Sequence, residues 1–201
     1  MKIREYFTAR RVTGLALLLA AVIVLQIFGG MIKIGTTPLS FVLVPIVLGG
    51  ALFGPFAGAF LGFAFGLIVW IHGLTGADPF TAALLADHFL LTTLLCIGKG
   101  VAAGLIPALI YKALAKKRRY AGIFLASAAA PVVNTSIFVV LALLMSDTLK
   151  KGFMQDGQSV LYFLVIVCAG INFLVEFAID LICAPALYTV VRAVEKKGGR
   201  S

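Results

Sequence analysis

Long apolar runs are the feature that most limits what this sequence can fold into. Six of them can be marked, at about residues 12–30, 38–53, 55–71, 88–114, 121–145 and 160–194. A run of about 18 or more apolar residues is long enough to cross a bilayer as a helix. Hydrophobic residues make up 62% of the chain and charged residues only 12%, a balance that excludes an ordinary soluble domain. We therefore predict an all-α membrane protein in which residues 1–201 form one bundle of six transmembrane helices.

The distribution of basic residues predicts how the bundle is oriented. Most of the 17 Lys and Arg residues lie in three clusters, at residues 2–11, 112–119 and 192–200. These clusters precede the first apolar run, separate the fourth from the fifth, and follow the sixth. The positive-inside rule then places both termini of this multi-pass membrane protein in the cytoplasm. Because the rule accounts for the net charge of +9, we do not expect a nucleic-acid partner.

A glycine recurs at every fourth position through the third run and its approach. The residues are Gly50, Gly54, Gly58, Gly62 and Gly66. In lipid there is little hydrophobic drive between helices, so association depends on close contact, and small residues four apart let two backbones approach. We predict that this ridge packs against a neighbouring helix. The Gly54-Pro55 pair is expected to form a tight turn with proline as the first helical residue.

Polar residues inside the spans predict a binding site. An ionisable group at the centre of a span costs about 2.5–3.5 kcal/mol, so such groups tend to be functional. Counted at about 1.5 Å per residue, Lys99, Asn134 and Asn172 all lie roughly 16–18 Å below the outer ends of their helices. Glu176 is one turn below Asn172 on the same face. We predict that these four side chains form a pocket open to the outer side, in which Lys99 meets a carboxylate and the carboxamides supply hydrogen bonds.

One other interpretation of these polar groups remains open. The four side chains could serve only to lock the bundle together, with an ion pair between Lys99 and Glu176. Asp180 lies one further turn along the same face, and we place it near the inner interface, outside the pocket.

The sequence offers no motif for catalysis or for a metal. It lacks the Gly-x-Ser-Gly nucleophile of rhomboid-type intramembrane proteases, a paired-aspartate protease motif and a Walker sequence. Its three cysteines have no Cys-x-x-Cys spacing, and neither histidine has a ligand-spaced partner. We therefore predict a protein that is not an enzyme and that needs no metal or cofactor.

Four stretches carry a resemblance to a known family. They are "ALLLA" with Ala16 and Ala20, the hairpin "FVLVPIVLGGALFGPFAGAFLGFAFG", "GKGVAAGLIPALIYKAL", and "APVVNTSIF". With six spans and long outer loops, the chain resembles the substrate-binding (S) component of energy-coupling factor (ECF) transporters, the bacterial vitamin importers. The resemblance implies that a vitamin or precursor binds at the outer face. It also implies a transmembrane coupling subunit, which docks at Ala16 and Ala20, and two ABC ATPases that supply the energy.

The substrate and the source of energy leave alternatives. The "GKG…PVVNT" pair is most similar to pantothenate-type members, and a small anionic hydroxy-acid amide would suit one lysine and two asparagines. Other vitamins stay open. A stand-alone secondary transporter driven by protons through Glu176 is a second hypothesis. A structural membrane protein without a ligand is a third.

Overall fold

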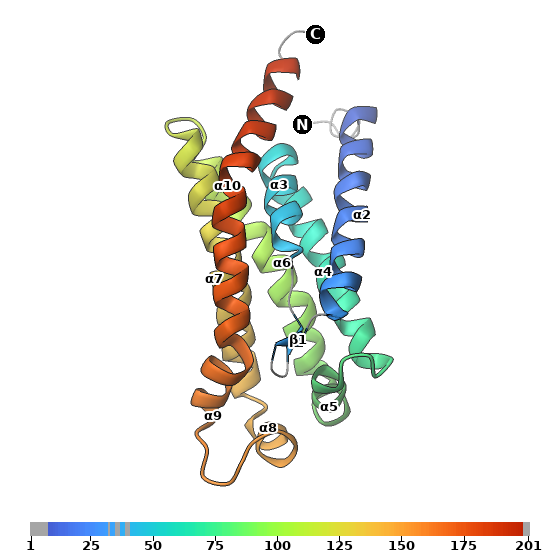
Figure 1. Ribbon diagram of the computed structural model, residues 1–201. Coiled ribbons are helices and arrows are strands. Elements are labelled where there is room, and N and C mark those ends of the chain that lie inside the picture. The colour runs from blue at the N-terminus through green and yellow to red at the C-terminus, as the bar shows by residue number, and fades with distance from the viewer. Residues whose placement is uncertain (1–7, 32, 35–36, 39–40, 199–201) are drawn as a thin grey trace.

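The computed structural model is a helical bundle, and it describes residues 8–31, 33–34, 37–38 and 41–198 (Figure 1). Its elements are α2 (Ala9–Met31), β1 (Lys33–Ile34), β2 (Thr37–Pro38), α3 (Leu43–Phe53), α4 (Pro55–Leu74), α5 (Pro79–Asp87), α6 (Phe89–Leu114), α7 (Arg119–Leu143), α8 (Ser146–Gly152), α9 (Val160–Tyr162), the π-helix η1 (Phe163–Gly170) and α10 (Ile171–Gly198). The two short strands pair antiparallel, with Ile34 opposite Thr37. The prediction of an all-helical membrane bundle is thereby confirmed.

Among the residues that the structure describes, five helical segments are long and apolar enough to span a membrane. They are Arg11–Gly29, Pro55–Leu74, Phe89–Leu114, Arg119–Leu143 and Val160–Val194. The second apolar run yields only α3, whose 11 residues begin at Leu43 rather than near residue 38. At about 1.5 Å per residue such a helix covers roughly half of a hydrocarbon core about 30 Å thick. The count of six full spans therefore stays a prediction.

Both ends of the described chain lie at the same end of the bundle. Figure 1 shows the start of α2 and the end of α10 together, with the strands, α5 and α8 at the opposite end. The α6–α7 connection, which carries the cluster at residues 112–119, lies at the end with the termini. This arrangement agrees with the pattern from which we predicted the orientation, and we call the end with α5 and α8 the outer end on that basis.

The glycine ridge lies where α4 meets α6. A Cβ atom added to Gly58 would overlap the carbonyl oxygen of Gly104, and one added to Gly62 would overlap that of Gly100. Gly66 meets the carbonyl oxygen of Cys96 in the same way. The two backbones thus touch over two turns, a contact that only glycine permits.

The first two glycines of the ridge lie differently. Gly50 belongs to α3, and an added Cβ would come 2.7 Å from the Cβ of Ala108 on α6. At Gly54 an added Cβ would meet no atom within 4 Å, so no close helix contact requires a glycine there. Its φ of 94° instead makes the turn between α3 and α4, with Pro55 as the first residue of α4. The prediction of a packing role for Gly54 is corrected accordingly, since the fourfold spacing runs across a turn.

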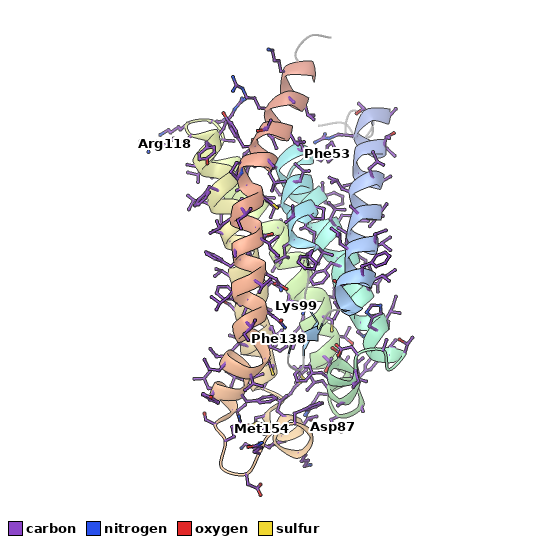
Figure 2. The ribbon with its side chains drawn as sticks, in the orientation of Figure 1. Phe53, Asp87, Lys99, Arg118, Phe138 and Met154 are labelled. Carbon is purple, nitrogen blue, oxygen red and sulfur yellow. The ribbon has the colours of Figure 1, made fainter. Side chains whose placement is uncertain are left out.

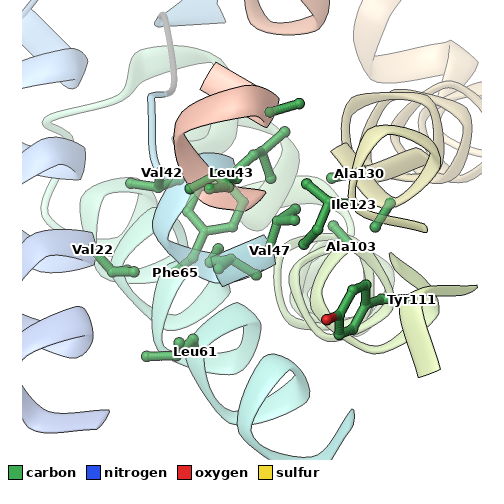
Figure 3. Packing of buried hydrophobic residues seen from close by; sticks show 14 of the residues in the cluster. Val22, Val42, Leu43, Val47, Leu61, Phe65, Ala103, Tyr111, Ile123 and Ala130 are labelled. Carbon is green, nitrogen blue, oxygen red and sulfur yellow. The ribbon is translucent and has the colours of Figure 1, made fainter. Parts of the chain in front are cut away.

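Two apolar clusters fill the bundle. The larger one joins α2, α3, α4, α6, α7 and the second half of α10, and Figure 3 shows Val22, Leu43, Phe65 and Ile123 among its members. The smaller one joins the outer ends of α6 and α7 to α5, α8 and η1. The candidate site lies between them, with Phe65 of the first cluster and Phe80 of the second in its lining.

Short helices close the outer end of the bundle. The carboxylate of Asp78 caps α5 by accepting a hydrogen bond from the backbone N–H of Phe80. The hydroxyl of Thr148 on α8 donates to a carboxylate oxygen of Asp87 on α5 over 2.7 Å. The ring of Phe80 also lies 5.1 Å from that of Phe153. These contacts hold α5 and α8 together as a cover over the bundle.

Candidate substrate-binding site

A polar cavity of about 90 Å³ lies inside the bundle, beneath α5. All four side chains that the sequence nominated line it: Lys99, Asn134, Asn172 and Glu176. They come from α6, α7 and α10, and three of them are nearly buried, with exposed fractions of 8% for Asn134, 7% for Asn172 and 6% for Glu176. Counting residues from the helix ends therefore identified a level at which these side chains do meet around one space.

Lys99 reaches this cavity because of the contact between α4 and α6. Its neighbour Gly100 lies directly against Gly62 of α4, so Lys99 emerges beside that seam. Its ammonium Nζ lies 5.7 Å from the centre of the Phe65 ring and 5.6 Å from that of Phe138. Figure 2 shows Lys99 and Phe138 close together in the outer half of the bundle. A cation within about 6 Å of a ring face is attracted by the ring quadrupole, so two aromatic rings hold the ammonium.

Asn134 presents an acceptor to the cavity. Its Oδ1 is buried, and among the residues that the structure describes it has no hydrogen-bond partner. Buried polar atoms are nearly always hydrogen-bonded, to protein, ordered water or ligand. The oxygen therefore marks a place where a hydrogen-bond donor of a bound molecule or a water fits.

Further polar residues of the cavity were missed in the sequence. They are Gln26 of α2, Thr92 of α6, Thr135 of α7, and Asp78 and Thr81 at the start of α5. Residues 72–87 lie between the third and fourth apolar runs and are not part of any predicted span, although Asp78 followed by Pro79 is a recognisable helix start. Gln26 carried a signal too, because it is a lone amide in an apolar run and is only 2% exposed.

Asp180 does not line the cavity. It lies one turn beyond Glu176 on α10, is 2% exposed, and has one carboxylate oxygen without a hydrogen-bond partner among the described residues. This agrees with the prediction that Asp180 lies outside the pocket, and its place near the inner interface stays a prediction.

The two alanines nominated for docking lie on α2, where both are exposed. Ala16 also lines a groove of about 260 Å³ between α2 and α4, together with Leu19, Phe53 and Phe60. At the end of this groove nearest the termini, the guanidinium of Arg11 donates a hydrogen bond to the carbonyl oxygen of Phe53 over 2.8 Å. The alanines are therefore accessible from the membrane side of the bundle.

Comparison with known proteins identifies the family. No curated protein matches the chain. The family described as "ECF transporter, substrate-specific component" matches residues 10–188, which include most of every apolar span and all the residues of the polar cavity. The chain therefore belongs to the substrate-specific components of ECF transporters, and it is a multi-pass membrane subunit of a transporter.

Proposed function

We propose that this protein captures a small water-soluble vitamin or vitamin precursor at the outer face of the bacterial plasma membrane for ATP-driven uptake. The observation that carries the proposal is the convergence of Lys99, Asn134, Asn172 and Glu176 on one cavity near the outer end of the bundle. Polar and ionisable side chains inside a membrane span cost free energy, so they are usually functional. In a family of substrate-specific components, the function that fits them is substrate binding.

The lining favours a ligand that carries one anionic group together with hydrogen-bond donors. The ammonium of Lys99 lies beside two neutral rings, and an ammonium is a hydrogen-bond donor that suits the carboxylate of a ligand. The Oδ1 of Asn134, which has no hydrogen-bond partner among the described residues, is an acceptor that a hydroxyl or amide N–H group of a ligand would meet, and Glu176 lines the same space. The second carboxylate of the lining, that of Asp78, already accepts hydrogen bonds from Phe80 and Thr81 at the start of α5. Pantothenate combines a carboxylate, hydroxyls and an amide, so it is the first compound to test.

The test is to identify what the protein holds. The purified wild-type chain is denatured and the released small molecules are identified by mass spectrometry, in parallel with Lys99→Met and Lys112→Met. Lys112 lies on the same helix but is exposed at the end with the termini, which makes it the matched control. We expect one ligand from wild type and Lys112→Met and a loss of at least about tenfold in Lys99→Met, since a charge-assisted contact contributes about 1.5–3 kcal/mol. Equal ligand in all three would refute the site.

The energy for uptake is proposed to come from partner subunits. We place the transmembrane coupling subunit on α2 at Ala16 and Ala20, with two ABC ATPases behind it. The test is purification of the chain from its native membrane: copurification of an ABC ATPase module would support this assignment. Uptake that survives ATP depletion and collapses with the proton gradient would instead favour a proton-coupled carrier that uses Glu176.

A further inference from the structure

A second hollow lies directly beside the polar cavity. It is a groove of about 410 Å³ on the membrane-facing side, between α7 and the segment that joins η1 to α10. Its lining is mostly apolar and includes Val132, Val139, Val140 and Val165. Three further residues, Thr135, Ala169 and Phe173, line both the groove and the polar cavity. The two spaces are therefore separated by a wall one side chain thick.

The wall is built on an unusual stretch of backbone. Ala169 is the penultimate residue of the π-helix η1, and Gly170 is the last. π-helical turns are rare and are found frequently at functional sites. Within η1, Cys168 lines the cavity, Val165 and Gly170 line the groove, and Ala169 lines both. Since Ala169 is small and Gly170 has no side chain, the ring of Phe173 is the one bulky group in this wall.

The volumes suggest that the two spaces act together. Sites for small organic ligands usually measure about 300–1,000 Å³. The polar cavity alone, at about 90 Å³, is well below that range. With the groove of about 410 Å³ the combined space falls within it.

We propose that the ligand is an amphiphile whose polar end binds at Lys99 and Asn134 and whose apolar arm passes the wall into the groove. This inference rests on the proposed function and narrows its substrate class. The groove faces lipid and is lined by valines, so an alkyl or other hydrocarbon arm fits it, whereas a polar group there would lose its hydrogen bonds. The passage lies between Thr135, Ala169 and Phe173, and the ring of Phe173 moves aside to admit the arm.

The passage is tested with two thiol reagents and the native Cys168, which lines the cavity next to the wall and is 1% exposed. The chain in lipid nanodiscs is treated with N-dodecylmaleimide or N-methylmaleimide, and alkylation of Cys168 is followed by peptide mass mapping. The dodecyl reagent has a polar head and an apolar arm, so it imitates the proposed ligand. We expect both reagents to modify Cys168 in the wild-type chain.

Two variants distinguish reagent that reaches Cys168 from the groove, through the wall, from reagent that reaches it by any other route. Ser136→Trp fills the groove from a residue that does not line the cavity, and Leu174→Trp adds the same bulk on an exposed face of α10 outside both spaces. We expect Ser136→Trp to slow the dodecyl reagent at least about tenfold, with the methyl reagent unchanged, and Leu174→Trp to slow neither. Equal rates for the dodecyl reagent in Ser136→Trp and wild type would overturn the inference. Failure of the dodecyl reagent to reach Cys168 in the folded wild-type chain would overturn it as well.

The ligand released from the purified protein provides the second criterion. A compound with a polar end and a hydrocarbon arm supports the inference. A compound that is polar throughout, pantothenate included, overturns it and leaves the proposed function standing. Ligand that is retained in Lys99→Met instead counts against the proposed function. The alkylation rates at Cys168 are measured independently of the ligand, so the two failures can be told apart.

Discussion

Replacing Gly62 by alanine tests whether the contact between α4 and α6 sets the packing of the bundle. A Cβ atom at Gly62 would overlap the carbonyl oxygen of Gly100 and come 2.8 Å from its carbonyl carbon, although Cβ atoms in proteins essentially never approach closer than 3.0 Å. Both obstructing atoms are backbone, so no side chain can move aside. The helices must therefore separate, and a gap of about 0.5–1 Å already forfeits a quarter to a half of the dispersion attraction between facing atoms.

The size of the effect follows from two opposing contributions. Forcing an extra carbon into a tightly packed contact costs about 1–3 kcal/mol. The helix itself gains up to about 1 kcal/mol, because alanine is the better helix former. We expect Gly62→Ala to lower the free energy of unfolding by about 1–2 kcal/mol, which for a chain of 150–250 residues lowers the melting temperature by roughly 2–8 °C.

Gly98→Ala is the matched control, measured by thermal unfolding in the same nanodiscs. Gly98 lies on α6, and an added Cβ there would meet only Leu94, at an ordinary contact distance of 3.5 Å. This variant should be as stable as wild type or more stable by up to about 1 kcal/mol. Lys99 and Phe65 flank the α4–α6 seam, so Gly62→Ala should also retain less ligand than Gly98→Ala. Equal melting temperatures for the two variants would refute the argument.

Three further substitutions address other parts of the molecule. Thr148→Val removes the hydrogen bond to Asp87 that joins α8 to α5, so we expect about 1 kcal/mol less stability in thermal unfolding and faster ligand release; unchanged release would show that this bond does not hold the cover. Asp180→Asn replaces a buried carboxylate outside the cavity, and we expect full ligand retention by mass spectrometry and no loss of stability, because an amide is cheaper to bury; loss of ligand would add Asp180 to the site. Ala16→Trp combined with Ala20→Trp should abolish copurification of the ATPase module while ligand stays bound, and an intact complex would exclude this face of α2.

The level of the candidate site could be predicted from the sequence because of simple helix geometry. Lys99, Asn134 and Asn172 lie on long helices that run in alternating directions, and a constant rise of about 1.5 Å per residue turns a residue count into a depth. The rotation of each helix about its own axis could not be read in this way. It depends on which small residues meet, as Gly62 and Gly100 do, and that is a property of the assembled bundle.

Other features of the fold left little trace in the sequence. The π-helix η1 occupies a run of apolar residues that would suit an α-helix equally well, so its wider turn reflects packing in the bundle rather than local preference. The α5 and α8 segments are short and lie between long runs, where their turn residues suggested loops. The cover of the site was therefore missed, and with it the contributions of Asp78 and Thr81 to the cavity.

The surroundings of Lys99 explain how a charge can persist at this depth and still be available to a ligand. A lysine near the centre of a span costs about 2.5–3.5 kcal/mol on insertion scales. Each cation–π contact returns about 0.5–1 kcal/mol, because the distances of 5.7 Å to Phe65 and 5.6 Å to Phe138 lie near the outer limit of such contacts. The rings thus offset part of the cost, and the carboxyl group of Glu176 lines the same cavity. An anionic group that enters the cavity supplies the remaining stabilisation, so the residual cost of burying Lys99 becomes a driving force for binding.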